Sequence, residues 1–169
     1  MPATSSPLAD AIIDGWRDYQ NQLVVITRPL SSEQLAIRVA PNLRPVGEIL
    51  AHVIAGRAFW LHQILHEGGD EIAPLMQWDD DGLPTRTAAE LADGLEATWN
   101  LIANALAHWT SEELAEQIVL PWIGPKYPIT RPFVIWHVLE HDLHHGGEIT
   151  HSLGKEGMEV KLPPPPPER

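Results

Sequence analysis

Four long segments of this chain repeat their apolar residues every three or four positions, and this helical period is the feature that most restricts the fold. Each segment is bounded by a proline, a glycine or a capping residue, and together they span about residues 6–27, 45–64, 87–109 and 130–153. In the third segment, Thr87 stands three residues before Glu90, which is the pattern of a capping box. No stretch of similar length alternates as a strand does. We therefore predict an all-α four-helix bundle.

The connections between these helices are of two kinds. Two of them, residues 69–86 and 110–129, are longer than helical hairpins normally need, so we expect at least one to cross the bundle. Two short pieces that begin with a serine, Ser31–Leu35 and Ser111–Ala115, are expected to form single helical turns capped by that serine. The sequence VLPWIGPKYPIT has a turn signal at Gly124 and predicts a small hairpin or an ordered loop.

The apolar stripes of the helices are expected to face the core, and they include Leu8, Ile12, Trp60 and Trp136. Trp78 and Trp122 fall in connections instead and could line the mouth of a pocket. We expect residues 1–162 to form one domain and the proline-rich tail, residues 163–169, to be disordered.

Composition excludes several classes of function. The 169 residues include 23 acidic against 11 basic side chains, a net charge of -12, which disfavours binding to nucleic acid. No apolar run reaches the roughly 20 residues of a membrane span, and the first ten residues lack a signal core, so we expect a cytoplasmic protein. Because the chain has no cysteine, a metal ion would be held by nitrogen and oxygen ligands.

Histidines gather in the fourth helical segment. His137, His141 and His145 follow one another at intervals of four. Residues four apart share a helix face with Cβ atoms about 6 Å apart, so two of these rings can converge on one ion. His52, in the second segment, is the obvious third ligand, although His137 could take its place or support a ligand by a hydrogen bond.

Two phrases of the sequence resemble the DinB-like metal-binding bundles, which include the bacillithiol and mycothiol transferases. They are RPVGEILAHVIAGRAFW, with His52, and HVLEHDLHHGGEI, with His141 and His145. The resemblance covers nearly the whole chain, and it implies that these three histidines hold one divalent ion (zinc, nickel or iron) with positions open for water or substrate.

The chain departs from the family after the paired histidines. The family often has Arg-Gly-Gln at this point, whereas this chain has Gly146, Gly147 and Glu148. Any contact with substrate that the arginine or glutamine makes in relatives is therefore not carried over. Two glycines inside a helix cost about 1 kcal/mol each relative to alanine, and we expect a close helix approach or a bend to compensate.

Carboxylates and further histidines flank the expected ligands. Glu148 shares the face of His141 and His145 and is the best candidate for a fourth ligand or a general base. Glu140 and Asp142 are also placed to orient an imidazole, and Glu48 precedes His52 by one helical turn. The remaining histidines are expected to pack against a neighbour or to lie at the surface, namely His144, His62, His66, His108 and His151.

Three neutral imidazoles leave a divalent ion its full charge and an open position, which is typical of catalytic sites. We therefore predict an enzyme that acts on a small molecule. The ion would activate a low-molecular-weight thiol for transfer to an electrophile, as the resemblance implies, or water for hydrolysis. The alternatives are a stress-associated metal-binding protein without turnover and a bundle whose histidines are satisfied internally. A homodimer is expected from the family and from the apolar content of the helices.

Overall fold

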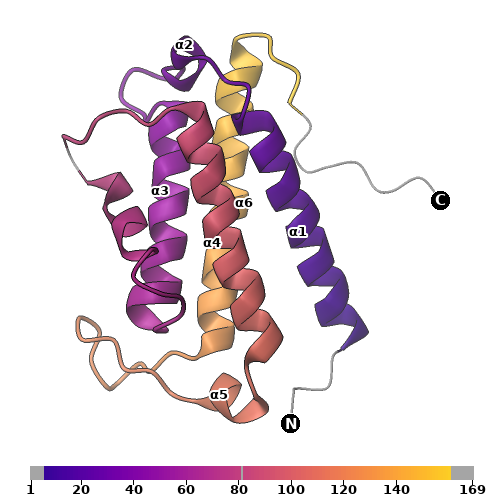
Figure 1. The fold of residues 1–169 in the computed structure, drawn as a ribbon, viewed down its shortest axis with the longest axis vertical. Coiled ribbons are helices and arrows are strands. Elements are labelled where there is room, and N and C mark those ends of the chain that lie inside the picture. The colour runs from indigo at the N-terminus through magenta and orange to yellow at the C-terminus, as the bar shows by residue number, and fades with distance from the viewer. Residues whose placement is uncertain (1–5, 81, 161–169) are drawn as a thin grey trace.

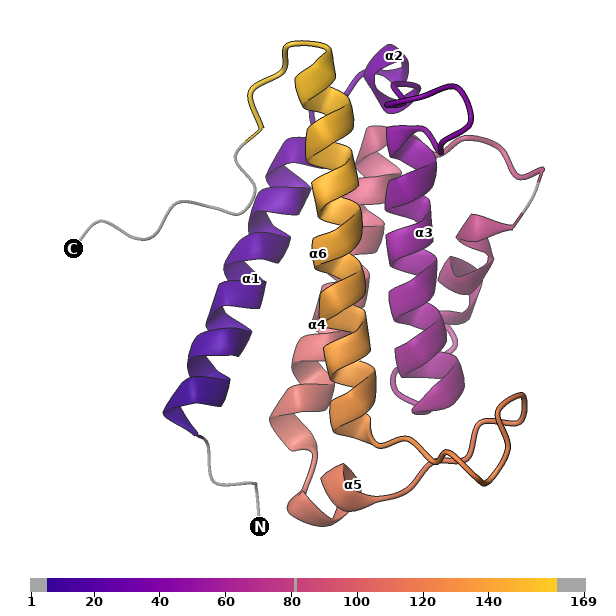
Figure 2. The same cartoon turned by 180° about the vertical axis from the view of Figure 1, so that it is seen from behind.

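The computed structural model describes residues 6–80 and 82–160 of the chain. Within them, four long helices pack side by side (Figures 1 and 2), namely α1 (Pro7–Thr27), α3 (Val46–Ala58), α4 (Ala88–His108) and α6 (Arg131–Lys155). A π-helical segment, η1 (Phe59–Ile64), extends α3 directly. The prediction of an all-α fold is confirmed, and the tail predicted at 163–169 lies outside the described residues.

The order of the helices explains the first long connection. α3 and α4 run in the same direction, so the chain between them returns along the length of α3 (Figure 1). This crossover contains the 3₁₀ helix η2 (Ala73–Asp79), which packs against α3. The expected crossing of the bundle is confirmed, and it places Asp79 beside the middle of α3.

The second long connection runs across the end of the bundle from α4 to α6 (Figure 2). It contains the short helix α5 (Ser111–Ala115) and an ordered loop. Ile118 and Ile129 exchange backbone hydrogen bonds of 2.8 and 2.9 Å across this loop, and Gly124 takes a φ of 80° at its tip. The ordered loop predicted for this sequence is confirmed.

Capping residues set the helix starts. The Thr87 hydroxyl accepts a hydrogen bond from the Glu90 amide, and the Glu90 carboxylate accepts one from the Thr87 amide, so the predicted capping box is confirmed. Ser31 caps the single-turn helix α2 (Ser32–Leu35) as expected. The expected serine cap of α5 is wrong by one residue, since Thr110 forms the capping box with Glu113. Ser111 stands three residues before Leu114, whose side chain cannot return the second hydrogen bond.

Apolar side chains from the four long helices fill the interior, and Trp16 packs edge to face against Trp99 with ring centroids 5.2 Å apart. Three residues of the predicted stripes lie outside it, Leu8 at 70% exposure, Ile12 at 48% and Trp136 at 60%. The first turns of α1 stand away from α6 (Figure 2), which leaves the first two uncovered. Trp136 is turned by about 200° from the buried Val134 and therefore faces outward.

The structure also bears on the expected absence of membrane segments. Over residues 6–80 and 82–160, no helix combines the length and the apolar character that crossing a membrane requires.

Candidate metal centre

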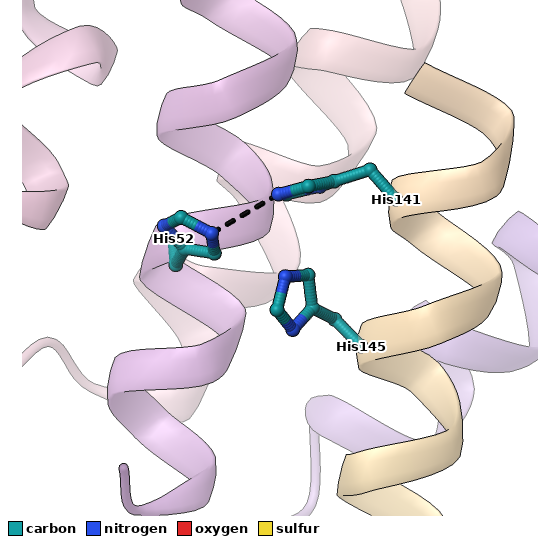
Figure 3. Close-up of side chains that lie close together, drawn as sticks. All are labelled: His52, His141 and His145. Atoms are coloured by element: carbon teal, nitrogen blue, oxygen red, sulfur yellow. Dashed lines mark hydrogen bonds between the residues drawn. The ribbon is translucent and has the colours of Figure 1, made fainter. Parts of the chain in front are cut away.

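Two antiparallel helices bring the three expected ligands together. His52 lies halfway along α3, and His141 and His145 lie on the side of α6 that faces it (Figure 3). The two Nε2 atoms of His52 and His141 are 3.0 Å apart, and the ring centroids of the three histidines are 4.4 to 4.8 Å apart. One ring nitrogen from each residue lies within 4.8 Å of the others. The arrangement has the donor atoms and the spacing of a three-histidine centre.

A glycine on α3 makes room for one of these rings. A Cβ atom added at Gly56 would lie 3.2 Å from Cε1 of His141, which is tighter than ordinary contact. Gly56 follows His52 by one helical turn, and this spacing is the only sequence signal of its role. The close approach expected at the glycines of α6 is not found at Gly147, where an added Cβ would meet nothing within 4 Å.

A carboxylate behind His52 fixes the orientation of that ring. Nδ1 of His52 lies 2.7 Å from Oδ2 of Asp79, and Arg44 donates to the other oxygen of Asp79 at 2.6 Å. With its proton on Nδ1, His52 presents the lone pair of Nε2 to the centre. Sequence reasoning missed Asp79, since it lies 27 residues from His52 in a connection without a metal-ligand pattern.

A second carboxylate serves His145 in the same way. Oε2 of Glu148 lies 2.7 Å from Nδ1 of His145, which leaves Nε2 of that ring free to face the other histidines. Glu148 was expected to be a fourth ligand or a base, and the structure places it in a hydrogen bond with His145 and in a second group of possible ligands with His144 and His145. His144 is 66% exposed and lies 3.7 Å from Glu148, and Glu48 is exposed on α3.

Asp142 interrupts the histidines in sequence but points into the core. Its carboxylate and the Arg57 guanidinium, both fully buried, pair at 2.7 and 2.9 Å, and the Trp16 indole donates to it at 2.8 Å. The interpretation of Asp142 as a residue that orients an imidazole is therefore wrong. Its side chain links α6 to α1 and α3, and it thereby holds the helix that carries two of the candidate ligands.

The environment favours the neutral forms of His141 and His145. Burial, helped by the neighbouring His145 and His52, lowers the pKa of His141 to about 3. Burial also lowers the pKa of His145, although its hydrogen bond to Glu148 opposes this shift. Since Nδ1 of His52 donates to Asp79, the short contact between the two Nε2 atoms requires His141 to donate to His52 in the metal-free protein. A bound ion would take the place of the proton that lies between the two Nε2 atoms. The neutral His141 ring would then carry its proton on Nδ1 instead.

The lowered pKa of His141 predicts that acid destabilises the metal-free protein. Between about pH 6.5 and 3 the unfolded chain protonates this histidine while the folded chain does not, so unfolding takes up a proton and stability falls as the pH falls. We expect His141→Gln to reduce the loss of unfolding free energy between pH 7 and 5, measured in urea. The exposed His151→Gln is the control, and equal pH slopes in both variants would refute the assignment.

Comparison with known proteins identifies the class to which this bundle belongs. The family model of the DinB superfamily matches residues 16–149, and the chain therefore belongs to this superfamily. The three-histidine group described above lies entirely within that match. No curated protein matches the chain.

Solved structures show the same fold at low sequence identity. A DinB-like protein from Bacillus cereus superposes with a TM-score of 0.69 at 18% identity, over 89% of this chain and 94% of that one. A DinB-like protein from Bacillus subtilis gives 0.63 at 18% identity, over 88% and 94%. A conserved protein from Enterococcus faecalis gives 0.64 at 14% identity, over 89% and 99%.

Proposed function

We propose that this protein is a divalent-metal-dependent enzyme in which His52, His141 and His145 hold the ion. The observation that supports this most strongly is the convergence of three imidazoles from two helices, two of them backed by carboxylates. Zinc-nitrogen bonds of 2.0–2.1 Å in a tetrahedron set neighbouring ligand atoms about 3.3 Å apart. The 3.0 Å between the Nε2 atoms of His52 and His141 needs only a small widening to meet that value, and the wider separations within the group, up to 4.8 Å, would have to shorten. The residues therefore fit zinc, and nitrogen donors also suit nickel and iron.

When bound, a divalent ion with three neutral ligands and an open position lowers the pKa of a thiol or a water molecule and so activates it. The side chains of the protein prepare this chemistry. Asp79 and Glu148 hold two rings with Nε2 directed inward, and burial keeps His141 neutral at physiological pH. Activation of a thiol rather than water is the specific form that the family resemblance favours, with a small-molecule electrophile as the second substrate.

Turnover by the metal-loaded protein tests this proposal. We expect zinc-, nickel- or iron-loaded protein to accelerate either transfer of a small thiol to 1-chloro-2,4-dinitrobenzene or hydrolysis of 4-nitrophenyl acetate. His141→Ala should abolish the acceleration, whereas His144→Ala, which removes a 66% exposed histidine of the same helix, should retain it. Metal binding with no acceleration of either reaction would favour the alternative of a non-catalytic metal-binding protein.

The carboxylate behind His52 gives a separate prediction. Asp79→Asn keeps the shape of the side chain and a hydrogen-bond acceptor but removes the charge, so His52 becomes a weaker ligand. We expect a loss of roughly 10–100-fold in zinc affinity, which is typical for partners of metal-bound histidines. The neighbouring, exposed Asp80→Asn is the control, and competition titration with a chelator is the measurement. Equal affinities of the two variants would show that Asp79 does not act through His52.

A further inference from the structure

A row of aromatic rings leads away from the three histidines toward the end of the bundle. The ring of His137 lies 6.2 Å from that of His141, and Trp60 contacts His137 edge to face with centroids 5.0 Å apart. Phe59 follows at 5.6 Å from Trp60, and Trp122 lies 6.0 Å from Phe59. These four residues outside the centre, together with Phe133, are called the aromatic row below. Phe133 stacks on His137 with the ring planes 3° apart.

Three elements supply the row, and each places its rings on the side of the metal centre. Phe133 and His137 continue the face of α6 that carries His141, at intervals of four residues. Phe59 and Trp60 belong to η1, and π-helical turns of this kind are frequent at functional sites. Trp122 belongs to the loop that the hydrogen-bonded pair Ile118 and Ile129 closes.

A cavity opens at the far end of the row. It has a volume of about 610 Å³ and a lining that is mainly apolar, and its walls include Phe59, Ile64, Met76, Leu120 and Trp122. This volume lies within the range of small-molecule sites, which are commonly lined by apolar and aromatic side chains. The expectation that Trp122 lines a pocket is confirmed. Trp122 is 58% exposed and Phe133 47%, so both rings offer apolar surface to a ligand.

We propose that the aromatic row and its cavity bind the apolar, ring-bearing part of the substrate whose reacting group lies at the three-histidine centre. This inference rests on the proposed function, and it narrows the substrate class to aryl or arylalkyl compounds. The physical reason is that the exposed rings of Trp122 and Phe133 offer faces and edges against which another aromatic ring packs favourably. A short polar substrate would leave these rings exposed to water and would gain no binding free energy from them.

Two thiols that differ only in a phenyl group test the proposal. We expect zinc-loaded protein to bind 2-phenylethanethiol at least about tenfold more tightly than ethanethiol in calorimetric titration, since the phenyl group is buried only in the longer thiol. Phe133→Ala, which removes the exposed ring stacked on His137, should reduce this ratio several-fold, whereas Trp122 lies at the far end of the row, beyond the reach of the two-carbon linker. Trp136→Ala is the matched control, because Trp136 is 60% exposed, against 47% for Phe133, and lies outside the row.

The outcomes separate this inference from the metal proposal. The role of the row would be overturned if the two thiols bound with equal affinity, or if Trp136→Ala reduced the affinity ratio of the two thiols as much as the row variant does. In either case, binding of ethanethiol would still report on the metal centre. Each thiol could bind zinc-loaded and metal-free protein with the same affinity, which would mean that the metal proposal had failed. Saturation-transfer NMR with 2-phenylethanol on metal-free protein then tests the aromatic row by itself. A ring signal lost in Trp122→Ala would support the row even though the metal proposal had failed, and no signal would overturn the row.

Discussion

Replacing Asp142 with leucine is expected to lower the free energy of unfolding by about 3–5 kcal/mol, because Arg57 would remain in the core as an unpaired charge. Both side chains are fully buried, and the guanidinium binds the carboxylate at 2.7 and 2.9 Å. The same substitution removes the acceptor of the Trp16 indole. Urea unfolding followed by circular dichroism measures the effect.

A double variant that also replaces Arg57 provides the control for this prediction. In the double variant Arg57→Met with Asp142→Leu no charge is left behind, so most of the lost stability should return. A single Asp142→Leu variant as stable as the wild type would contradict the assignment of this pair as the link between α6 and the core. A double variant no more stable than the single one would show that the cost lies in packing rather than in the unpaired charge.

The second large effect is expected at the metal centre. His141→Ala should weaken zinc binding by roughly 100-fold or more, since it removes a ligand directly, whereas loss of a supporting partner already costs 10–100-fold. The remaining imidazoles of His52 and His145 come from different helices and have no third donor from this group. Competition titration against a chromogenic chelator measures the affinity, and circular dichroism checks that the variant folds.

His144→Ala is the matched control for this substitution. His144 lies on the same helix, three residues from His141, but its side chain is 66% exposed, and it belongs to a separate group of possible ligands with His145 and Glu148 rather than to the three-histidine group. We expect its zinc affinity to stay within about threefold of the wild type. An affinity that falls equally in both variants would point to nonspecific binding along the exposed face of α6.

The sequence predicted the helices well because their signals are local. The helical period and the capping box of Thr87 with Glu90 depend on residues within a few positions of each other. The same period cannot say where a neighbouring helix ends, and for that reason Leu8 was wrongly expected in the core. Trp136 was wrongly expected there because it lies about 200° around the helix from the buried Val134. Whether a residue of a stripe is covered depends on tertiary packing, which the period does not contain.

The site was predicted only in part, because its assembly also depends on tertiary packing. The interval between His141 and His145 places both on one face, but the meeting with His52 depends on the direction and stagger of α3 and α6. Asp79 reaches His52 only because the crossover returns along α3, and nothing in its local sequence indicates this. The pairing of Asp142 with Arg57 was missed because a carboxylate between histidines has the same sequence pattern whether it faces the site or the core.

Elemental analysis of the untagged protein, incubated with zinc, nickel or iron and then dialysed, tests the metal centre most directly. We predict one divalent ion per chain in the wild type and near-complete loss in both His52→Ala and His141→Ala, because each removes one of the three converging imidazoles. Absence of metal from the wild type after incubation, or a metal content in either folded variant equal to that of the wild type, would contradict this prediction. In that case the bundle would hold its histidines by the hydrogen bonds seen between His52, His141 and Asp79 and between His145 and Glu148.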